Sequence, residues 1–265
     1  MAPKLRTFLM LALVGLLAMM ALGAFDMASA HPEDDFCEGG GGFDQALCRQ
    51  LSELNSSEAS LTHPLLDAEG NVRSGWSSAL YFMNIGVQHI LPGGTDHILF
   101  VLALFLVAPN LRSLVIQISI FTVAHTATLG LTAAGLIDVP ARVVEPLIAL
   151  SIAFVAVENL WKFDLSRWRP LVIFGFGLFH GMGFAGYIRE IGLPPEQFWP
   201  SLIGFNVGVE IGQLTVVLAA VLLSIPLKHL LPTYGLSYQK VVVVPTSMVI
   251  AAIGLWWAIS RSLGF

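Results

Sequence analysis

The chain has 265 residues, of which 55% are hydrophobic and only 12% are charged, and its formal net charge is −5. A soluble domain carries about 25% charged residues, and the mean hydropathy here is +0.76. This composition excludes an ordinary soluble protein, indicates an integral protein of a lipid bilayer, and predicts no nucleic-acid partner.

Residues 1–30 have the features of a signal peptide. MAPKLR supplies a short basic start, TFLMLALVGLLAMMALGA supplies an apolar run, and Ala28-Ser29-Ala30 is a cleavage site with small residues. We predict cleavage after Ala30. A retained N-terminal anchor is the alternative, because the apolar run is long for a signal peptide.

Residues 31–75 form an acidic segment, with nine acidic residues against Arg49 and Arg73. We expect this segment to be extracytoplasmic, where Cys37 and Cys48 would be oxidised to a disulfide. The ring would span CEGGGGFDQALC. Metal binding by the two cysteines is the weaker alternative, because they lack CxxC spacing.

Residues 76–265 form the predicted transmembrane domain, an all-α polytopic bundle of about six transmembrane helices. The apolar runs predict spans at about 94–109, 113–135, 141–161, 170–188, 199–225 and 241–262. The stretch SSALYFMNIGVQHIL precedes the break at Pro92-Gly93-Gly94. It is either an interfacial helix or the first half of a broken one.

Lysine and arginine in the loops predict the orientation. One set of helix ends carries six basic residues and the other carries three. The six are Arg112, Lys162, Arg167, Arg169, Lys228 and Lys240, and the three are Arg142, Arg189 and Arg261. The larger set is predicted to be cytoplasmic, which places both termini outside a plasma (inner) membrane and agrees with a cleaved signal peptide.

Ionisable residues within the spans are the candidate functional residues, because a charge at mid-bilayer costs at least ~2.5–3.5 kcal/mol. By depth, they predict a stepped route for a cation from the outer carboxylates and imidazole, through the centre, to an inner carboxylate. Asn206, Glu210 and Gln213 share one helical face. The predicted metal ligands are Asp96, His97 and Glu145 near the outer face, His125, His180 and Glu210 near the centre, and Glu158 near the inner face.

Imidazole and carboxylate ligands suit divalent nickel, cobalt, zinc or copper, and no thiolate is available within the spans. For a single histidine such as His125, simple hydrogen bonding between helices is the competing interpretation. His89 and His229 are predicted to be interfacial. His89 enters the route only if the Pro-Gly-Gly turn folds it back toward Asp96.

Five motifs in order carry a family resemblance: GVQHILPGGTDHILFVLALFL, FTVAHTATLGL, VEPLIALSIAFVAVENL, FGLFHGMGFA and GFNVGVEIGQL. Together they resemble the HupE/UreJ family, in its second branch. The resemblance implies a membrane accessory protein of hydrogenase or urease systems with a role in nickel uptake. It maps the family's D-H pair onto Asp96 and His97, although six residues separate His89 from Asp96 where the broader nickel/cobalt transporters carry H-x4-D-H.

The intramembrane ligands predict a permease for a divalent transition metal, carried as cargo with no resident cofactor, and the resemblance implies nickel as that metal. The protein is predicted not to be an enzyme. Since the chain contains no Walker A motif, facilitated diffusion or proton coupling would drive transport. An intramembrane zinc-dependent hydrolase, or a non-transporting accessory to a metalloenzyme maturation system, are the alternatives.

Overall fold

The computed structural model describes residues 73–108, 110–161, 168–184 and 195–264, and these ranges contain helices and no strand. The predicted signal peptide, most of the acidic segment, and Cys37 and Cys48 lie outside the described residues. The helices are α3 (Gly75–Ile90), α4 (Thr95–Val107), α5 (Leu111–Ala133), α6 (Ala141–Trp161), α7 (Arg169–Gly183), η1 (Pro195–Gln197), α9 (Phe198–Thr233), the π-helical η2 (Gln239–Val243) and α10 (Val244–Leu263).

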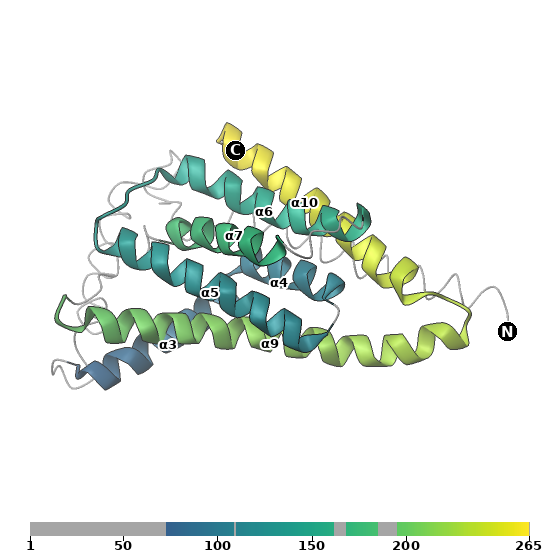
Figure 1. Ribbon diagram of the computed structural model, residues 1–265, viewed down its shortest axis with the longest axis horizontal. Coiled ribbons are helices and arrows are strands. Elements are labelled where there is room, and N and C mark those ends of the chain that lie inside the picture. The colour runs from purple at the N-terminus through teal and green to yellow at the C-terminus, as the bar shows by residue number, and fades with distance from the viewer. Residues whose placement is uncertain (1–72, 109, 162–167, 185–194, 265) are drawn as a thin grey trace, which may run out of the picture.

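Three close helix pairs surround one short helix. α3 packs along α9, α6 along α10, and α5 along α7, while α4 lies between them and contacts α6, α9 and α10. Figure 1 shows α9 running along one edge of the molecule with α3 beside its first half. Because α4 is central, its buried residues Phe100, Val101 and Leu104 belong to the main core.

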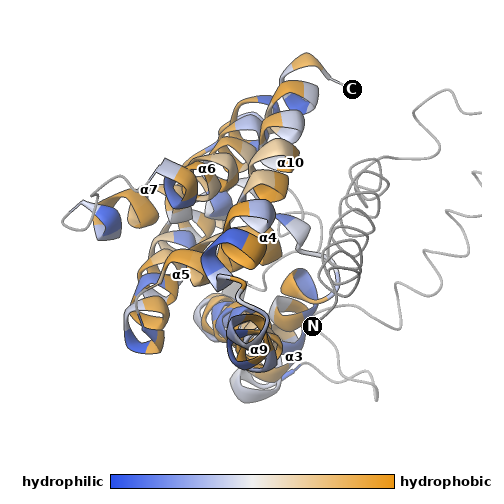
Figure 2. Cartoon of the chain, turned by 90° about the vertical axis from the view of Figure 1, so that its right-hand side faces the viewer, coloured by the Kyte–Doolittle hydropathy of each residue, from blue (hydrophilic) through white to orange (hydrophobic). Residues whose placement is uncertain are grey.

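The predicted α-helical membrane bundle is confirmed. Among the described residues, four helices are long and apolar enough to span a membrane, namely α5, α6, α9 and the continuous stretch Gln239–Leu263. The bent pair α3 and α4 can form a fifth span. Hydrophobic residues colour most of the ribbon (Figure 2). Large apolar side chains such as Val123 and Leu223 are exposed on its surface, as expected for a surface that faces lipid.

The described residues contain four such helices, or five spans with the bent pair, where hydropathy predicted about six for the chain. The predicted first span contains α4, which has only 13 residues, and the described part of the predicted fourth span contains α7, which has 15. At 1.5 Å per residue both are shorter than the ~30 Å hydrocarbon core.

The break between α3 and α4 supports the broken-helix alternative for SSALYFMNIGVQHIL. The two helices meet at 71°, and the turn between them is held by backbone hydrogen bonds from Leu91 to Val87 and from Gly94 to Ile90. A Cβ at Gly94 would lie 2.3 Å from the carbonyl oxygen of His89, so only glycine permits this close return. The turn therefore sends the chain back against the end of α3.

Glycine also determines how closely α3 approaches α9. A Cβ on Gly86 would lie 2.0 Å from the carbonyl oxygen of Phe205, and one on Gly208 would lie 2.0 Å from that of Met83. Close backbone contact of this kind is typical of small residues between membrane helices. It places the C-terminal end of α3, with His89, inside the bundle.

Candidate metal centre

Four histidines from four different helices meet in the interior of the bundle. His89 lies in α3, His97 in α4, His125 in α5 and His180 in α7. The ring centroid of His97 is 4.8 Å from that of His89, 5.8 Å from that of His125 and 4.9 Å from that of His180. We call these four residues the histidine cluster.

Each imidazole of the histidine cluster has a buried ring nitrogen without a hydrogen-bond partner. These atoms are Nε2 of His89, His97 and His125, and Nδ1 of His180. Buried polar atoms are nearly always satisfied by protein or water, so four such nitrogens in one place indicate that a ligand completes them. A metal ion is the ligand that lone-pair nitrogens bind together.

The geometry of three of these side chains suits one metal ion. The potential ligand atoms of His89, His97 and His125 all lie within 4.8 Å of one another. The nitrogen ligands of one tetrahedral zinc ion, each at about 2.0–2.1 Å from it, lie about 3.3–3.4 Å apart. A contraction of about 1.5 Å in the longest separation would therefore close the set around an ion.

Aromatic rings enclose the histidine cluster. The ring centroid of Phe184 is 3.8 Å from that of His89, and Phe121 and Phe100 lie 4.9 Å and 5.4 Å from His180. The rings of Phe121 and Phe100 are fully buried. Apolar walls lower the local dielectric, which strengthens electrostatic contacts at the site.

Two residues outside the cluster contact its imidazoles. Asn206 on α9 has its Oδ1 atom 3.1 Å from Nδ1 of His125, and Ser151 on α6 has its Oγ atom 3.0 Å from Nε2 of His180. Both contacts are buried. Six helices therefore contribute to this site, counting the two that supply Asn206 and Ser151.

Two of the predicted carboxylate ligands form ion pairs instead of joining the histidine cluster. Asp96 accepts two hydrogen bonds from Arg261 on α10, at 2.9 and 3.1 Å. Glu158 accepts from Arg169 at 3.0 Å, and Arg169 also donates to Gln117 on α5 at 2.9 Å. Hydropathy and spacing identified the carboxylates but could not identify these partners.

The other two predicted carboxylates also lie apart from the three-histidine set. Glu210 accepts a 2.6 Å hydrogen bond from Ser119 across the α5–α9 interface, and Glu145 is half-buried near the start of α6. Among the described residues, the group of histidine and acidic side chains close enough to share an ion consists of His89, His97 and His125. His97, His125 and His180, which were predicted to lie at successive depths along a route, are instead gathered in one cluster.

His89 is the member of the site that sequence reasoning left out. Its position before Pro92-Gly93-Gly94 suggested the membrane interface, but the turn folds it against His97, the neighbour of Asp96. The sequence feature that could have indicated this is HILPGGTDH, in which a histidine stands on each side of a Pro-Gly-Gly turn that can reverse the chain.

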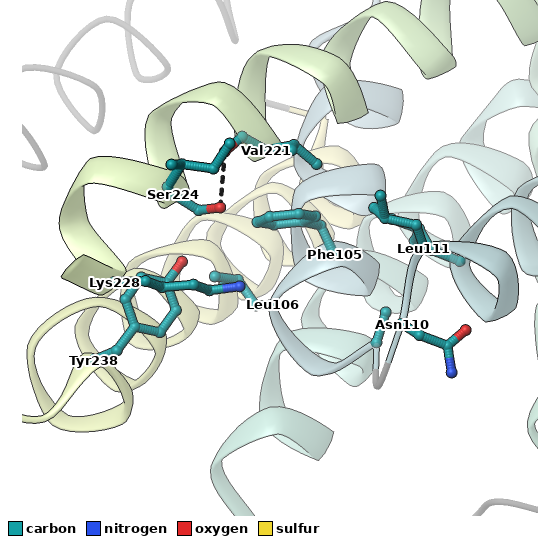
Figure 3. Close-up of a pocket in the computed structure, with 11 residues that line it drawn as sticks. Phe105, Leu106, Asn110, Leu111, Val221, Ser224, Lys228 and Tyr238 are labelled. Carbon is teal, nitrogen blue, oxygen red and sulfur yellow. Dashed lines mark hydrogen bonds between the residues drawn. The ribbon is translucent and has the colours of Figure 1, made fainter.

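A separate cavity of about 240 Å³ lies between the end of α4, the start of α5 and the second half of α9 (Figure 3). Its described lining includes Phe105, Leu106, Val221, Lys228 and Tyr238, and contains no histidine or carboxylate. Because it lacks such ligands, this cavity is distinct from the histidine cluster in chemistry as well as in position.

A family model described as HupE / UreJ protein matches residues 67–261. The match covers every helix of the described bundle up to Arg261 and includes all four residues of the histidine cluster. No curated protein and no solved structure matches the chain.

Proposed function

This chain belongs to the HupE / UreJ family, and we propose that it is a membrane permease for a divalent transition-metal ion, with nickel as the first candidate. The histidine cluster is the proposed binding site for the ion on its way across the membrane. The ion is cargo, so each turnover requires both its capture and its release.

The observation that carries this proposal is the convergence of four imidazoles, each with a buried ring nitrogen left without a partner. Single histidines in membrane helices are accounted for by hydrogen bonds between helices. Four imidazoles with free nitrogens exceed what helix association requires. Membership of the HupE / UreJ family supports nickel as the ion.

The ligand chemistry supports a transition metal over magnesium or calcium. Imidazole nitrogen suits nickel, cobalt, zinc and divalent copper, whereas carboxylate and carbonyl oxygens suit magnesium and calcium. Asp96, the carboxylate next to His97 in the sequence, forms an ion pair with Arg261. The proposed site is therefore an all-nitrogen site.

His89 and His97 lie on opposite sides of the α3–α4 break, so any change in the angle between these helices alters their separation. We propose that such a change releases the ion. Residues 91–94 connect α3 to α4. A change of conformation in these four residues would change the angle between the two helices, and with it the separation of His89 and His97.

Uptake by reconstituted vesicles tests the permease. The full chain would be purified and reconstituted, and entry of Ni²⁺, Co²⁺ and Zn²⁺ would be compared for wild type, His97→Ala and His229→Ala. His229 is exposed on α9 and is the matched control. We expect His97→Ala to lose at least about tenfold of the uptake rate and His229→Ala to retain it. Equal uptake by all three proteins would refute the proposal.

A zinc hydrolase is the second candidate, because three histidines with an open fourth position also form catalytic zinc sites. His89, His97 and His125 are such a set. The two functions differ in retention of the ion. A hydrolase purifies with tightly held stoichiometric zinc, whereas a carrier exchanges its ion readily.

A non-transporting accessory protein is the remaining alternative. It would support metalloenzyme maturation even after all four histidines are replaced.

A further inference from the structure

The neutral imidazole ring has one nitrogen that carries hydrogen and one that carries a lone pair, and only the latter can bind a metal. Which nitrogen is which depends on the hydrogen bond made at the other side of the ring. In the histidine cluster, His125 and His180 each have one ring nitrogen in contact with a side chain and one without a partner.

Asn206 can present only an acceptor to His125. Its amide Nδ2 donates to the carbonyl oxygen of Leu202 at 2.8 Å. Rotating the amide by 180° would place two oxygen acceptors against each other at Leu202 and would lose that bond. Oδ1 therefore faces Nδ1 of His125 as an acceptor, so this nitrogen must carry the hydrogen, and Nε2 keeps the lone pair.

Ser151 likewise presents an acceptor to His180. Its hydroxyl oxygen lies 2.6 Å from the carbonyl oxygen of Ile148, a separation at which the hydroxyl hydrogen must lie between the two oxygens. The hydroxyl has no second hydrogen to give. Nε2 of His180 therefore donates to Ser151, and Nδ1 keeps the lone pair.

We propose that Asn206 and Ser151 are positioning residues that fix the tautomers of two imidazoles, so that His125 offers Nε2 and His180 offers Nδ1 to the ion. The atoms assigned as lone-pair donors are the same ones that are buried without a partner. This inference rests on the proposed metal-binding function. It also requires His180, which lies outside the three residues whose ligand atoms are within 4.8 Å of one another, to move closer to the ion and bind it through Nδ1 as a fourth imidazole.

Nitrogen NMR of the metal-free protein tests the tautomers directly. The full chain would be labelled with ¹⁵N-histidine, and the signals assigned with His125→Gln and His180→Gln. We expect wild-type His125 to be protonated on Nδ1 and His180 on Nε2. Asn206→Ala should abolish the preference of His125, and Ser151→Ala that of His180, whereas Asn206→Asp and Ser151→Thr retain an acceptor and should preserve them.

Thr122→Val is the matched control, because the Thr122 hydroxyl donates to Gln213 across the same α5–α9 interface and not to a histidine. Titration with Ni²⁺ should give a Kd about 10–100-fold weaker for Asn206→Ala and Ser151→Ala, and one near wild type for Thr122→Val. A wild-type spectrum with hydrogen on Nε2 of His125 or on Nδ1 of His180 would overturn the inference, even if both alanine variants failed to fold.

The tautomer inference and the permease proposal fail in different experiments. A protein with the expected tautomers that binds Ni²⁺ but moves no ion into vesicles would refute the permease and support the tautomer assignment. A protein that transports Ni²⁺ with the opposite tautomers would do the reverse.

Discussion

At the scale of single residues, two of the carboxylates predicted as metal ligands are neutralised by arginines. Asp96 with Arg261 and Glu158 with Arg169 each join two helices through side chains that are less than a quarter exposed. A charge left alone in such surroundings is expensive. The pairs therefore explain how Asp96 and Glu158 are tolerated within an apolar bundle.

Replacing Asp96 with Asn tests whether it stabilises the fold or binds the ion. Because Arg261 would keep its charge without its carboxylate partner, we expect a loss of about 1–3 kcal/mol in unfolding free energy, measured in mixed micelles with denaturant. Arg261→Met combined with Asp96→Asn should recover most of that loss, and Ni²⁺ affinity should be little changed in the double variant. Tenfold weaker Ni²⁺ binding that the second substitution fails to restore would identify Asp96 as a ligand.

At the scale of elements, the close packing of α3 against α9, which we call the α3–α9 seam, determines the position of His89. Gly204 and Gly208 on α9 bring that helix against the carbonyl oxygens of Ala79 and Met83 on α3. There is no space for a methyl group at these positions. The seam thus couples the packing of two helices to the geometry of the metal site.

Gly208→Ala should force α3 away from α9, because the new Cβ would lie 2.0 Å from the carbonyl oxygen of Met83. We expect a cost of about 1–3 kcal/mol in stability and weaker Ni²⁺ binding, as His89 moves with α3. Gly175→Ala on α7 is the control, since nothing lies within 4 Å of its added Cβ, and helix propensity predicts a gain of up to ~1 kcal/mol. Similar behaviour of both variants would contradict the role of the seam.

At the scale of the whole molecule, an ion bound by the histidine cluster would join α3, α4, α5 and α7. A ligand that binds only the folded state stabilises it by about 2.7 kcal/mol at 100 times its Kd. We therefore expect Ni²⁺, Co²⁺ or Zn²⁺ to raise the thermal unfolding midpoint of the purified protein, and a chelator to reverse the rise.

The same whole-molecule measurement has two controls. Mg²⁺ should leave the midpoint unchanged because imidazole is a poor ligand for it, and His97→Ala should remove the response to Ni²⁺. An equal rise with Mg²⁺, or a full response in His97→Ala, would place the stabilising ion elsewhere in the molecule.

Hydropathy and motif spacing were sufficient for the class of fold and for most of the imidazoles. Long apolar runs predict membrane helices because the bilayer forces backbone polar groups to bond within each segment, and His97, His125 and His180 stood out by their depth. The number of spans depends on where helices break. The short α4 and α7 lie within longer apolar runs, and hydropathy does not indicate where a helix breaks.

By itself, the sequence determined that this is a helical membrane protein with histidines in its apolar interior, because composition and local pattern are properties of the chain. Tertiary structure alone decided which histidines meet, that His89 is among them, and that Asp96 and Glu158 are paired with arginines. Those outcomes depend on contacts between helices far apart in the sequence, such as Arg261 with Asp96, and no local pattern specifies them.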